Sequence, residues 1–196
     1  MNSRIWLTAQ DLPDGLDILR SDETGKYVAR REYADLACPG CGKLNERAAF
    51  ERGLYPVPAF RCRRTMFCST DNVYVGKSNL RQLLDQILPG VFNFYPIPSS
   101  PGYFVMEPKD SIVPNPGDAG FQFLNPCKRC GRFEELLFKP GTSFQIPDRP
   151  FVSIVLEGRL GKRPLWLFTK NLADELRRHK PTMKGMELSK KEVTLE

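Results

Sequence analysis

Histidine is almost absent from this sequence, and long apolar runs are absent altogether. A single histidine, His179, stands among 196 residues, which gives little support to catalytic schemes or open metal sites built on imidazole. No window approaches the roughly 18 consecutive apolar residues that a membrane-spanning helix needs. The segment Met1–Leu16 carries charged and turn-forming residues where a signal peptide needs an apolar stretch. We therefore expect a cytoplasmic protein that makes no membrane contact and is not an enzyme.

The composition is typical of a globular protein. Hydrophobic residues make up 41% of the chain and charged residues 27%, with a mean hydropathy of −0.38. These values exclude disordered and collagen-like chains. A chain of 196 residues can bury one core of ordinary size, so we expect a single domain over residues 1–196.

The positive charge is concentrated near the C-terminal end. The chain carries a net charge of +6, and the segment 159–191, with ten Lys and Arg against three acidic residues, accounts for +7. A basic segment of this kind is compatible with nucleic acid or another acidic partner, although a charge cluster is usually a solvated face.

The six cysteines fall into three pairs, and two of these pairs occur in matching pentapeptides. Without export signals, metal binding is the leading interpretation, because disulfides are scarce in the cytosol. The pentapeptides are CPGCG at 38–42 and CKRCG at 127–131. A glycine directly after the second cysteine suits a metal knuckle, since the chain turns sharply there and needs a positive φ.

Two knuckles supply four thiolates, the tetrahedral set of a closed structural zinc site. The sequence thus predicts a zinc-ribbon-like part made from residues 26–45 and 120–135, with a strand over Lys26–Tyr33 before the first knuckle. One alternative pairs the first knuckle with Cys62 and Cys68, although five residues between them are too many for a simple knuckle. Another is redox-active thiols, against which the duplication argues, and zinc is not distinguished from iron. The predicted ligands are Cys38, Cys41, Cys127 and Cys130.

An internal repeat relates two further segments at a shift of 92 residues. Residues 72–96 are predicted to form a strand, a polar turn with Ser78 as capping residue, an amphipathic helix that Pro89-Gly90 stops, and a second strand. Residues 163–193 repeat this order. Such units imply right-handed crossovers that pack helices on a sheet, or a pair of duplicated half-domains.

The repeat makes specific predictions for the two helices. It aligns leucines of the first helix with leucines of the second, and all of them are predicted to be buried. It also places His179 at the position of Ile87, on the inward helix face, as a half-buried packing residue. The aligned leucines are Leu80 with Leu172 and Leu84 with Leu176.

These patterns together predict a mixed α/β (α+β) fold, with two strand–helix–strand repeats and a zinc-ribbon-like double-knuckle subdomain. Further strands are expected over residues 103–106, in the proline-rich connector, and over 120–126, which leads into the second knuckle.

The sequence resembles the bacterial double-CXXCG motif family, which includes immunity proteins paired with Sit-type lipoprotein toxins exchanged between kin cells. The two pentapeptides carry this resemblance, together with the strand–helix segments Val73–Pro96 and Pro164–Glu192. It covers residues 25–193. The resemblance implies a cytoplasmic immunity protein, or antitoxin, that binds a cognate toxin domain, occludes or distorts its active site, and needs no catalysis.

The alternative function is that of a zinc-ribbon regulator that binds nucleic acid. It is favoured by the basic C-terminal segment and by Arg61, Arg63 and Arg64, which stand beside aromatic residues. The basic charge also argues against an inhibitor that mimics nucleic acid, because such an inhibitor is acidic.

Overall fold

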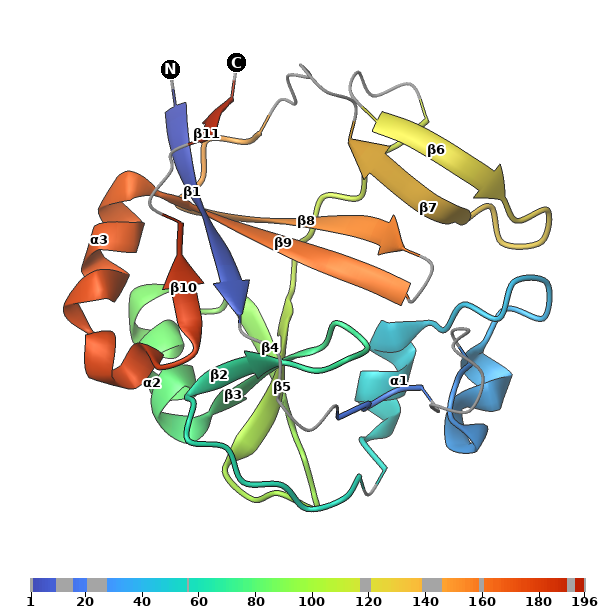
Figure 1. The fold of residues 1–196 in the computed structure, drawn as a ribbon, viewed down its shortest axis with the longest axis horizontal. Helices are drawn as coiled ribbons and strands as arrows, with labels where there is room; N and C mark the ends of the chain where they lie inside the picture. The colour runs from blue at the N-terminus through green and yellow to red at the C-terminus, as the bar shows by residue number, and fades with distance from the viewer. Residues whose placement is uncertain are drawn as a thin grey trace.

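Three antiparallel sheets and a few short helices form the mixed α+β fold of the computed structural model (Figure 1). The structure describes residues 2–9, 16–20, 28–55, 57–116, 121–138, 146–158, 161–189 and 193–195. Within these ranges, no helix has the length and apolar character needed to cross a membrane.

The sheet that contains both chain ends is called the terminal sheet here. Its strand order is β10-β1-β9-β8, and β11 pairs with β1 beside β10. Its strands are β1 (Asn2–Ala9), β8 (Phe151–Gly158), β9 (Gly161–Thr169), β10 (Met186–Leu188) and β11 (Val193–Leu195).

The second sheet, called the central sheet, has the order β2-β3-β5-β4, and β6 pairs with β7 in a separate hairpin. The strands of the central sheet are β2 (Met66–Cys68), β3 (Tyr74–Lys77), β4 (Phe92–Pro96) and β5 (Tyr103–Pro108). The hairpin consists of β6 (Phe121–Pro126) and β7 (Phe133–Phe138). The helices are η1 (Arg31–Leu36), α1 (Glu46–Arg52), α2 (Ser78–Ile87), α3 (Lys170–Arg178) and η2 (Lys180–Met183), of which η1 and η2 are 3₁₀ helices.

Both larger sheets contain a strand–helix–strand connection with another strand inserted between its two strands. In the central sheet α2 connects β3 to β4, and β5 lies between them, antiparallel to both. In the terminal sheet α3 connects β9 to β10, and β1 lies between them, antiparallel to both. The strand orders therefore correspond, although the inserted strand follows the unit in one sheet and comes from the N-terminal end in the other. That the two units superpose stays a prediction.

The core lies on both faces of the central sheet. All four leucines that the repeat aligned are buried, and they pack in one cluster with residues of β1, β9 and β2. Tyr74 of β3 belongs to this cluster, whereas Val75 belongs to a second one with Tyr33 and Phe50. Successive strand residues point to opposite faces. The terminal sheet and helices α2 and α3 therefore cover one face of the central sheet, and the η1–α1 region covers the other.

Gly185 allows the chain to pass directly against β2. The backbone N–H groups of Thr65 and Met66 donate to the carbonyl oxygen of Lys184, at 2.6 and 3.1 Å. Gly185 has a φ of +92°, and a Cβ at this position would clash with the Met66 carbonyl oxygen. A side chain is thus excluded here by the backbone conformation and by the lack of space.

The strand expected before the first knuckle is not formed. Residues 31–36 form η1 instead. Some residues of the predicted segments lie outside the described residues: Lys26 and Tyr27 of this strand, Gly120 of the strand before the second knuckle, and residues 190–192 of the second repeat. η1 forms in place of the strand because of a tertiary anchor. Tyr33 is fully buried, its hydroxyl donates to the carbonyl oxygen of Gly53 at 3.2 Å, and it accepts from the N–H of Tyr55 at 3.0 Å.

Two predictions at helix ends are also wrong. Ser78 is the first residue of α2 and does not cap it, and its hydroxyl donates to the carbonyl oxygen of Gly102 at 3.2 Å. His179 is exposed at the C-terminal end of α3, because this helix ends at Arg178 and the histidine follows in a turn. The end of α2 at Ile87, before Pro89-Gly90, agrees with the prediction.

Candidate metal centre

The four cysteines of the two pentapeptides come together, although 89 residues separate the corresponding members along the chain. Their sulfur atoms all lie within 4.8 Å of one another. The Cys38 and Cys127 sulfurs are 3.9 Å apart, and those of Cys41 and Cys130 are 3.7 Å apart. A tetrahedron with Zn–S bonds of about 2.3 Å has edges of about 3.8 Å, whereas a disulfide needs about 2.05 Å. The group can hold a metal ion, and all four cysteines are free thiols.

The two knuckles have the same backbone geometry. Gly42 donates its N–H to the carbonyl oxygen of Cys38 at 2.7 Å, and Gly131 donates to that of Cys127 at 2.9 Å. The φ angles of the two glycines are +74° and +72°, as the sequence predicts. Each knuckle is closed by one further bond, from the first cysteine's N–H to the carbonyl oxygen five residues later, at 2.9 Å and 2.8 Å. The two pentapeptides, which match in sequence, therefore also have the same backbone conformation.

Short antiparallel pairings hold each knuckle at the end of a hairpin. The first knuckle lies between η1 and α1, where Ala37 pairs with Leu44. The second is the turn of the β6–β7 hairpin, where Pro126 pairs with Phe133. Pro126 and Phe133 follow Ala37 and Leu44 by 89 residues, the same separation as between the corresponding cysteines. Figure 1 shows the β6–β7 turn directly above the loop that leads into α1.

The two sulfurs of a knuckle differ in acidity. Backbone N–H groups of Cys130 and Arg129 lower the pKa of Cys127 to about 6, and the N–H of Gly40, 3.4 Å from the Cys38 sulfur, lowers the pKa of Cys38. Desolvation raises the pKa of Cys41 to about 12 and also raises that of Cys130. Four thiolates at this spacing repel one another, so a cation is needed to hold all of them deprotonated.

A network of charged side chains lies behind the knuckles, and three of its members, Lys43, Glu46 and Glu157, are buried. Lys43 and Arg132 each follow a knuckle glycine, and both bind Glu157 of β8, at 2.8 Å and 3.0 Å. Burial opposes ionisation of Glu157, but the hydrogen bonds from these two cations outweigh it and lower its pKa. Arg132 also lies 3.6 Å from Glu46 of α1, and Lys162 of β9 lies 3.3 Å from the same carboxylate. The network fixes both knuckles to α1 and to the β8–β9 hairpin.

Sequence analysis missed this network, although a signal was present. The similarity of the pentapeptides continues for one residue, because a cation follows each glycine: Lys43 in one knuckle and Arg132 in the other. Their partner Glu157 gives no local sign of its role. It is recognised only when β8 is placed beside the knuckles.

The alternative pairing with Cys62 and Cys68 is not formed. Cys68 is buried in β2, and Cys62 is half-buried and accepts the N–H of Arg64 at 3.4 Å. Neither belongs to the four-cysteine group, which within the described ranges is the one cluster of three or more potential metal ligands. Both thiols pack as ordinary residues at or near β2.

The sequence and structure were also compared with known proteins. No family model matches the chain, and no curated protein and no solved structure matches it. The site is therefore interpreted from its own geometry.

Proposed function

We propose that the four knuckle cysteines hold one structural zinc ion. The observation that carries this proposal is the pair of sulfur–sulfur distances, 3.7 and 3.9 Å, which fit the edges of a tetrathiolate zinc tetrahedron. Four protein ligands complete the coordination of zinc, so that no position is left for a substrate. This donor set supports a structural and not a catalytic role.

We propose further that the protein is an immunity protein, which neutralises a cognate bacterial toxin domain by binding to it, and that it is not an enzyme. The resemblance to the double-CXXCG family supports this function, because it rests on the two pentapeptides that build the knuckles. A metal site with four protein ligands agrees with this function, since a binding protein needs the metal only to stabilise its fold.

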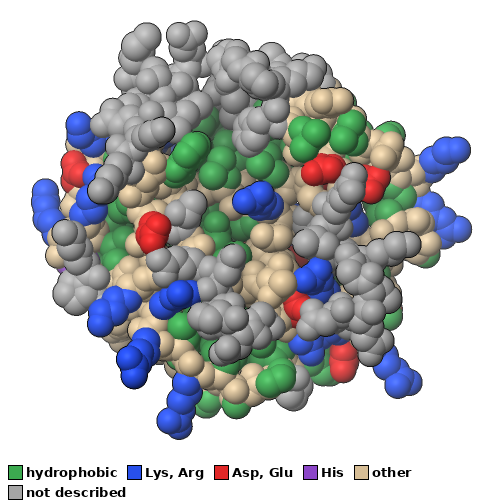
Figure 2. Space-filling view, in the orientation of Figure 1, with side chains coloured by type: hydrophobic (Ala, Val, Ile, Leu, Met, Phe, Trp, Pro, Cys, Tyr) green, Lys and Arg blue, Asp and Glu red, His purple; other side chains and the backbone are tan. Residues whose placement is uncertain are grey.

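The alternative of a nucleic-acid-binding regulator receives less support, because the basic segment does not form one face. Lys162 and Arg163 begin β9, and Arg177 and Arg178 end α3, beyond the other end of a strand that spans about 25 Å. Arg177 pairs with Asp174 at 2.7 Å, and Lys162 pairs with Glu46 at 3.3 Å. On the face of the molecule that Figure 2 shows, basic side chains are spread out, with acidic and hydrophobic side chains between them.

The immunity proposal expects a toxin domain to be encoded beside this gene, and co-expression with that domain tests it. We expect the wild-type protein to restore growth and to co-purify with the toxin domain, and the Cys41→Ser variant to lose both properties together with the metal. The control is Cys62→Ser, which removes a thiol outside the four-cysteine group. Failure of the wild-type protein to protect, combined with tight and salt-sensitive binding to nucleic acid, would establish the regulator instead.

We also propose that residues 72–96 and 163–193 are structural repeats. The corresponding strand orders of the two larger sheets and the burial of all four aligned leucines support this. An experimentally determined structure tests it. The two strand–helix–strand units should superpose with the aligned leucines at equivalent positions.

A further inference from the structure

Two side chains connect the knuckles to each other, and their contacts are reciprocal. Lys43 follows the first knuckle, and its ammonium group donates to the carbonyl oxygens of Phe133 and Glu134, at 2.5 and 3.0 Å. Arg132 follows the second knuckle, and its guanidinium donates to the carbonyl oxygen of Leu44, at 2.7 Å. The two cations have the same separation along the chain as the corresponding cysteines, 89 residues. Each knuckle therefore supplies a cation that binds the backbone beside the other knuckle.

The two cations share one counter-charge. Lys43 binds Glu157 at 2.8 Å, and Arg132 binds it at 3.0 Å. These three residues are called the inner group here. The side chains of Lys43 and Glu157 are 5% and 9% exposed, and that of Arg132 is 23% exposed. The inner group thus carries one positive charge in excess, and solvent screens it weakly, so that it acts on neighbouring charged groups.

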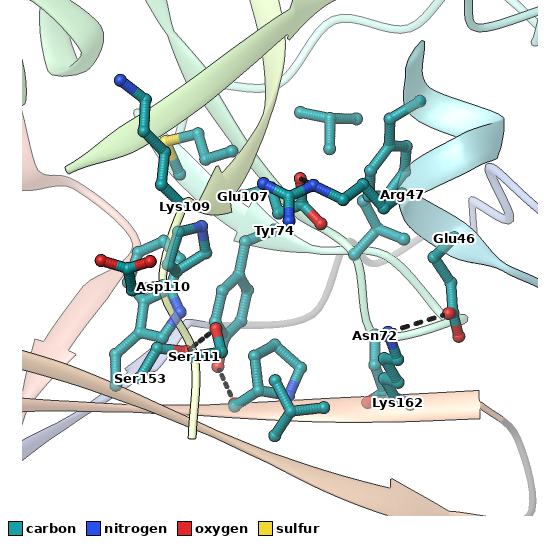
Figure 3. A pocket seen from close by; sticks show the side chains of 18 of the residues that line it. Glu46, Arg47, Asn72, Tyr74, Glu107, Lys109, Asp110, Ser111, Ser153 and Lys162 are labelled. Atoms are coloured by element: carbon teal, nitrogen blue, oxygen red, sulfur yellow. Dashed lines mark hydrogen bonds and ion pairs between the residues drawn. The ribbon is translucent and has the colours of Figure 1, made fainter. Parts of the chain in front are cut away.

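The outer end of the network is neutral. Glu46 lies 3.6 Å from Arg132 and pairs with Lys162 at 3.3 Å. Figure 3 shows Glu46 and Lys162 on the α1 side of a pocket of about 350 Å³ between the central and terminal sheets, which no cysteine lines. Asp71, a further buried acid in the pocket wall, accepts the N–H groups of residues 18 and 19 instead. The Glu46–Lys162 pair adds no net charge, so the excess positive charge remains with the inner group.

The inner group lies next to the thiols that are proposed to bind the metal. The backbone N–H of Lys43 donates to the Cys41 sulfur, and that of Arg132 donates to the Cys130 sulfur. The Arg132 guanidinium is also close enough to Cys130 for their charges to interact. Four thiolates around one divalent ion carry two negative charges in excess, so metal binding to four thiols releases protons and creates negative charge. Positive charge beside the site stabilises this product.

We propose that the inner group sets the metal affinity of the four-cysteine site through its charge. Lys43 and Arg132 strengthen metal binding, whereas Glu157, which holds both cations in place, weakens it. This inference rests on the proposed zinc site. The hydrogen bonds from Lys43 and Arg132 to the sulfurs come from the backbone, so they do not depend on the side chains at these positions. Side-chain variants therefore report on the effect of charge.

Metal titrations of the full chain test this proposal. The reduced, metal-free protein, shown to be folded by circular dichroism, is titrated with cobalt(II), whose absorption reports thiolate ligands, and zinc affinity is measured by competition with a chelator at pH 7. We expect Lys43→Met and Arg132→Met each to weaken zinc binding about tenfold, the lower end of what residues behind metal ligands contribute. We expect Glu157→Gln to strengthen zinc binding although it destabilises the fold. The opposite signs are decisive, because a merely structural role predicts weaker binding in all three variants.

Lys128→Met is the matched control, because it removes a cation from an exposed position of the second knuckle, where solvent screens the charge, and it should bind zinc as the wild type does. Arg132→Lys keeps the charge and should bind zinc more tightly than Arg132→Met, a comparison that remains decisive if Glu157→Gln does not fold without metal. Weaker or unchanged zinc binding in Glu157→Gln, or equal binding by the two Arg132 variants, would overturn the proposal. A wild-type protein that binds neither cobalt nor zinc would instead refute the zinc site itself.

Discussion

Replacing Cys127 with serine tests the role of the metal in the fold. The cluster brings Cys38 and Cys127 together across 89 residues of chain, so the proposed metal would act as a cross-link that closes a long loop. Removing one of four thiolates leaves an incomplete coordination set. We expect Cys127→Ser to lose the metal and most of the stability that the cross-link supplies.

The size of the effect follows from the length of the loop. The chain-entropy relation for a cross-link over about 90 residues gives about 4.5 kcal/mol, against a total stability of about 5–15 kcal/mol for a folded domain. With a denaturant dependence of about 2–3 kcal/mol per molar urea, the unfolding midpoint should fall by about 2 M. The loss of stability should exceed this value, because each knuckle also carries a cation that pairs with the buried Glu157.

The assay combines urea unfolding with elemental analysis of the purified protein. The wild type should contain one zinc ion per chain, and a chelator should shift its midpoint toward that of Cys127→Ser. Cys62→Ser is the matched control, because it makes the same chemical change outside the cluster and should keep the metal. The reasoning fails if wild-type protein contains neither zinc nor iron, or if the two variants unfold at the same urea concentration.

Two further predictions concern the surroundings of the site and the close approach at β2. Glu157→Gln leaves Lys43 and Arg132 without their buried counter-charge and should cost about 3 kcal/mol at pH 7. The folded pKa of Glu157 lies below the ordinary value of 4.5, so the stability difference between wild type and variant should persist above pH 4.5 and shrink as the pH falls below it. A stability difference that grows in acid would contradict this assignment. Gly185→Ala should cost about 3 kcal/mol in urea unfolding, because φ is positive and backbone blocks the Cβ. Gly90→Ala, with a φ of +73° and open space, should cost about 1 kcal/mol, and equal losses would show that the clash is relieved.

Features that depend on a few neighbouring residues were predictable from the sequence. A knuckle needs two cysteines and one glycine at positive φ within five residues, and both knuckles form as expected. The spacing of the leucines likewise predicted the inward faces of α2 and α3, because helical periodicity is local. The convergence of the knuckles was predictable for a chemical reason, since neither pair of thiolates alone completes a tetrahedral site.

Features set by contacts between distant segments could not be predicted in this way. Residues 31–36 form η1 instead of a strand because Tyr33 is anchored by the backbone of residues 53 and 55. The insertion of β1 between β9 and β10 and the pairing of Glu157 with Lys43 join segments more than 100 residues apart. The pairing of Glu157 with Arg132 spans 25 residues. Local pattern carries no information about such partners, so the network and the pocket between the sheets became visible only in three dimensions.

The position of β1 has a consequence for the order in which the protein is made. This strand is synthesised long before its partners β9, β10 and β11, which lie more than 150 residues further along the chain. The central sheet and both knuckles are complete in sequence before β9 is synthesised. A nascent chain can therefore bring the four cysteines together and form the central sheet while β1 is still unpaired, and the terminal sheet closes only once β9, β10 and β11 have been synthesised. A chain released before β9 is made would carry the assembled four-cysteine group together with an unpaired β1 that exposes Ile5 and Leu7, which marks it for aggregation or proteolysis.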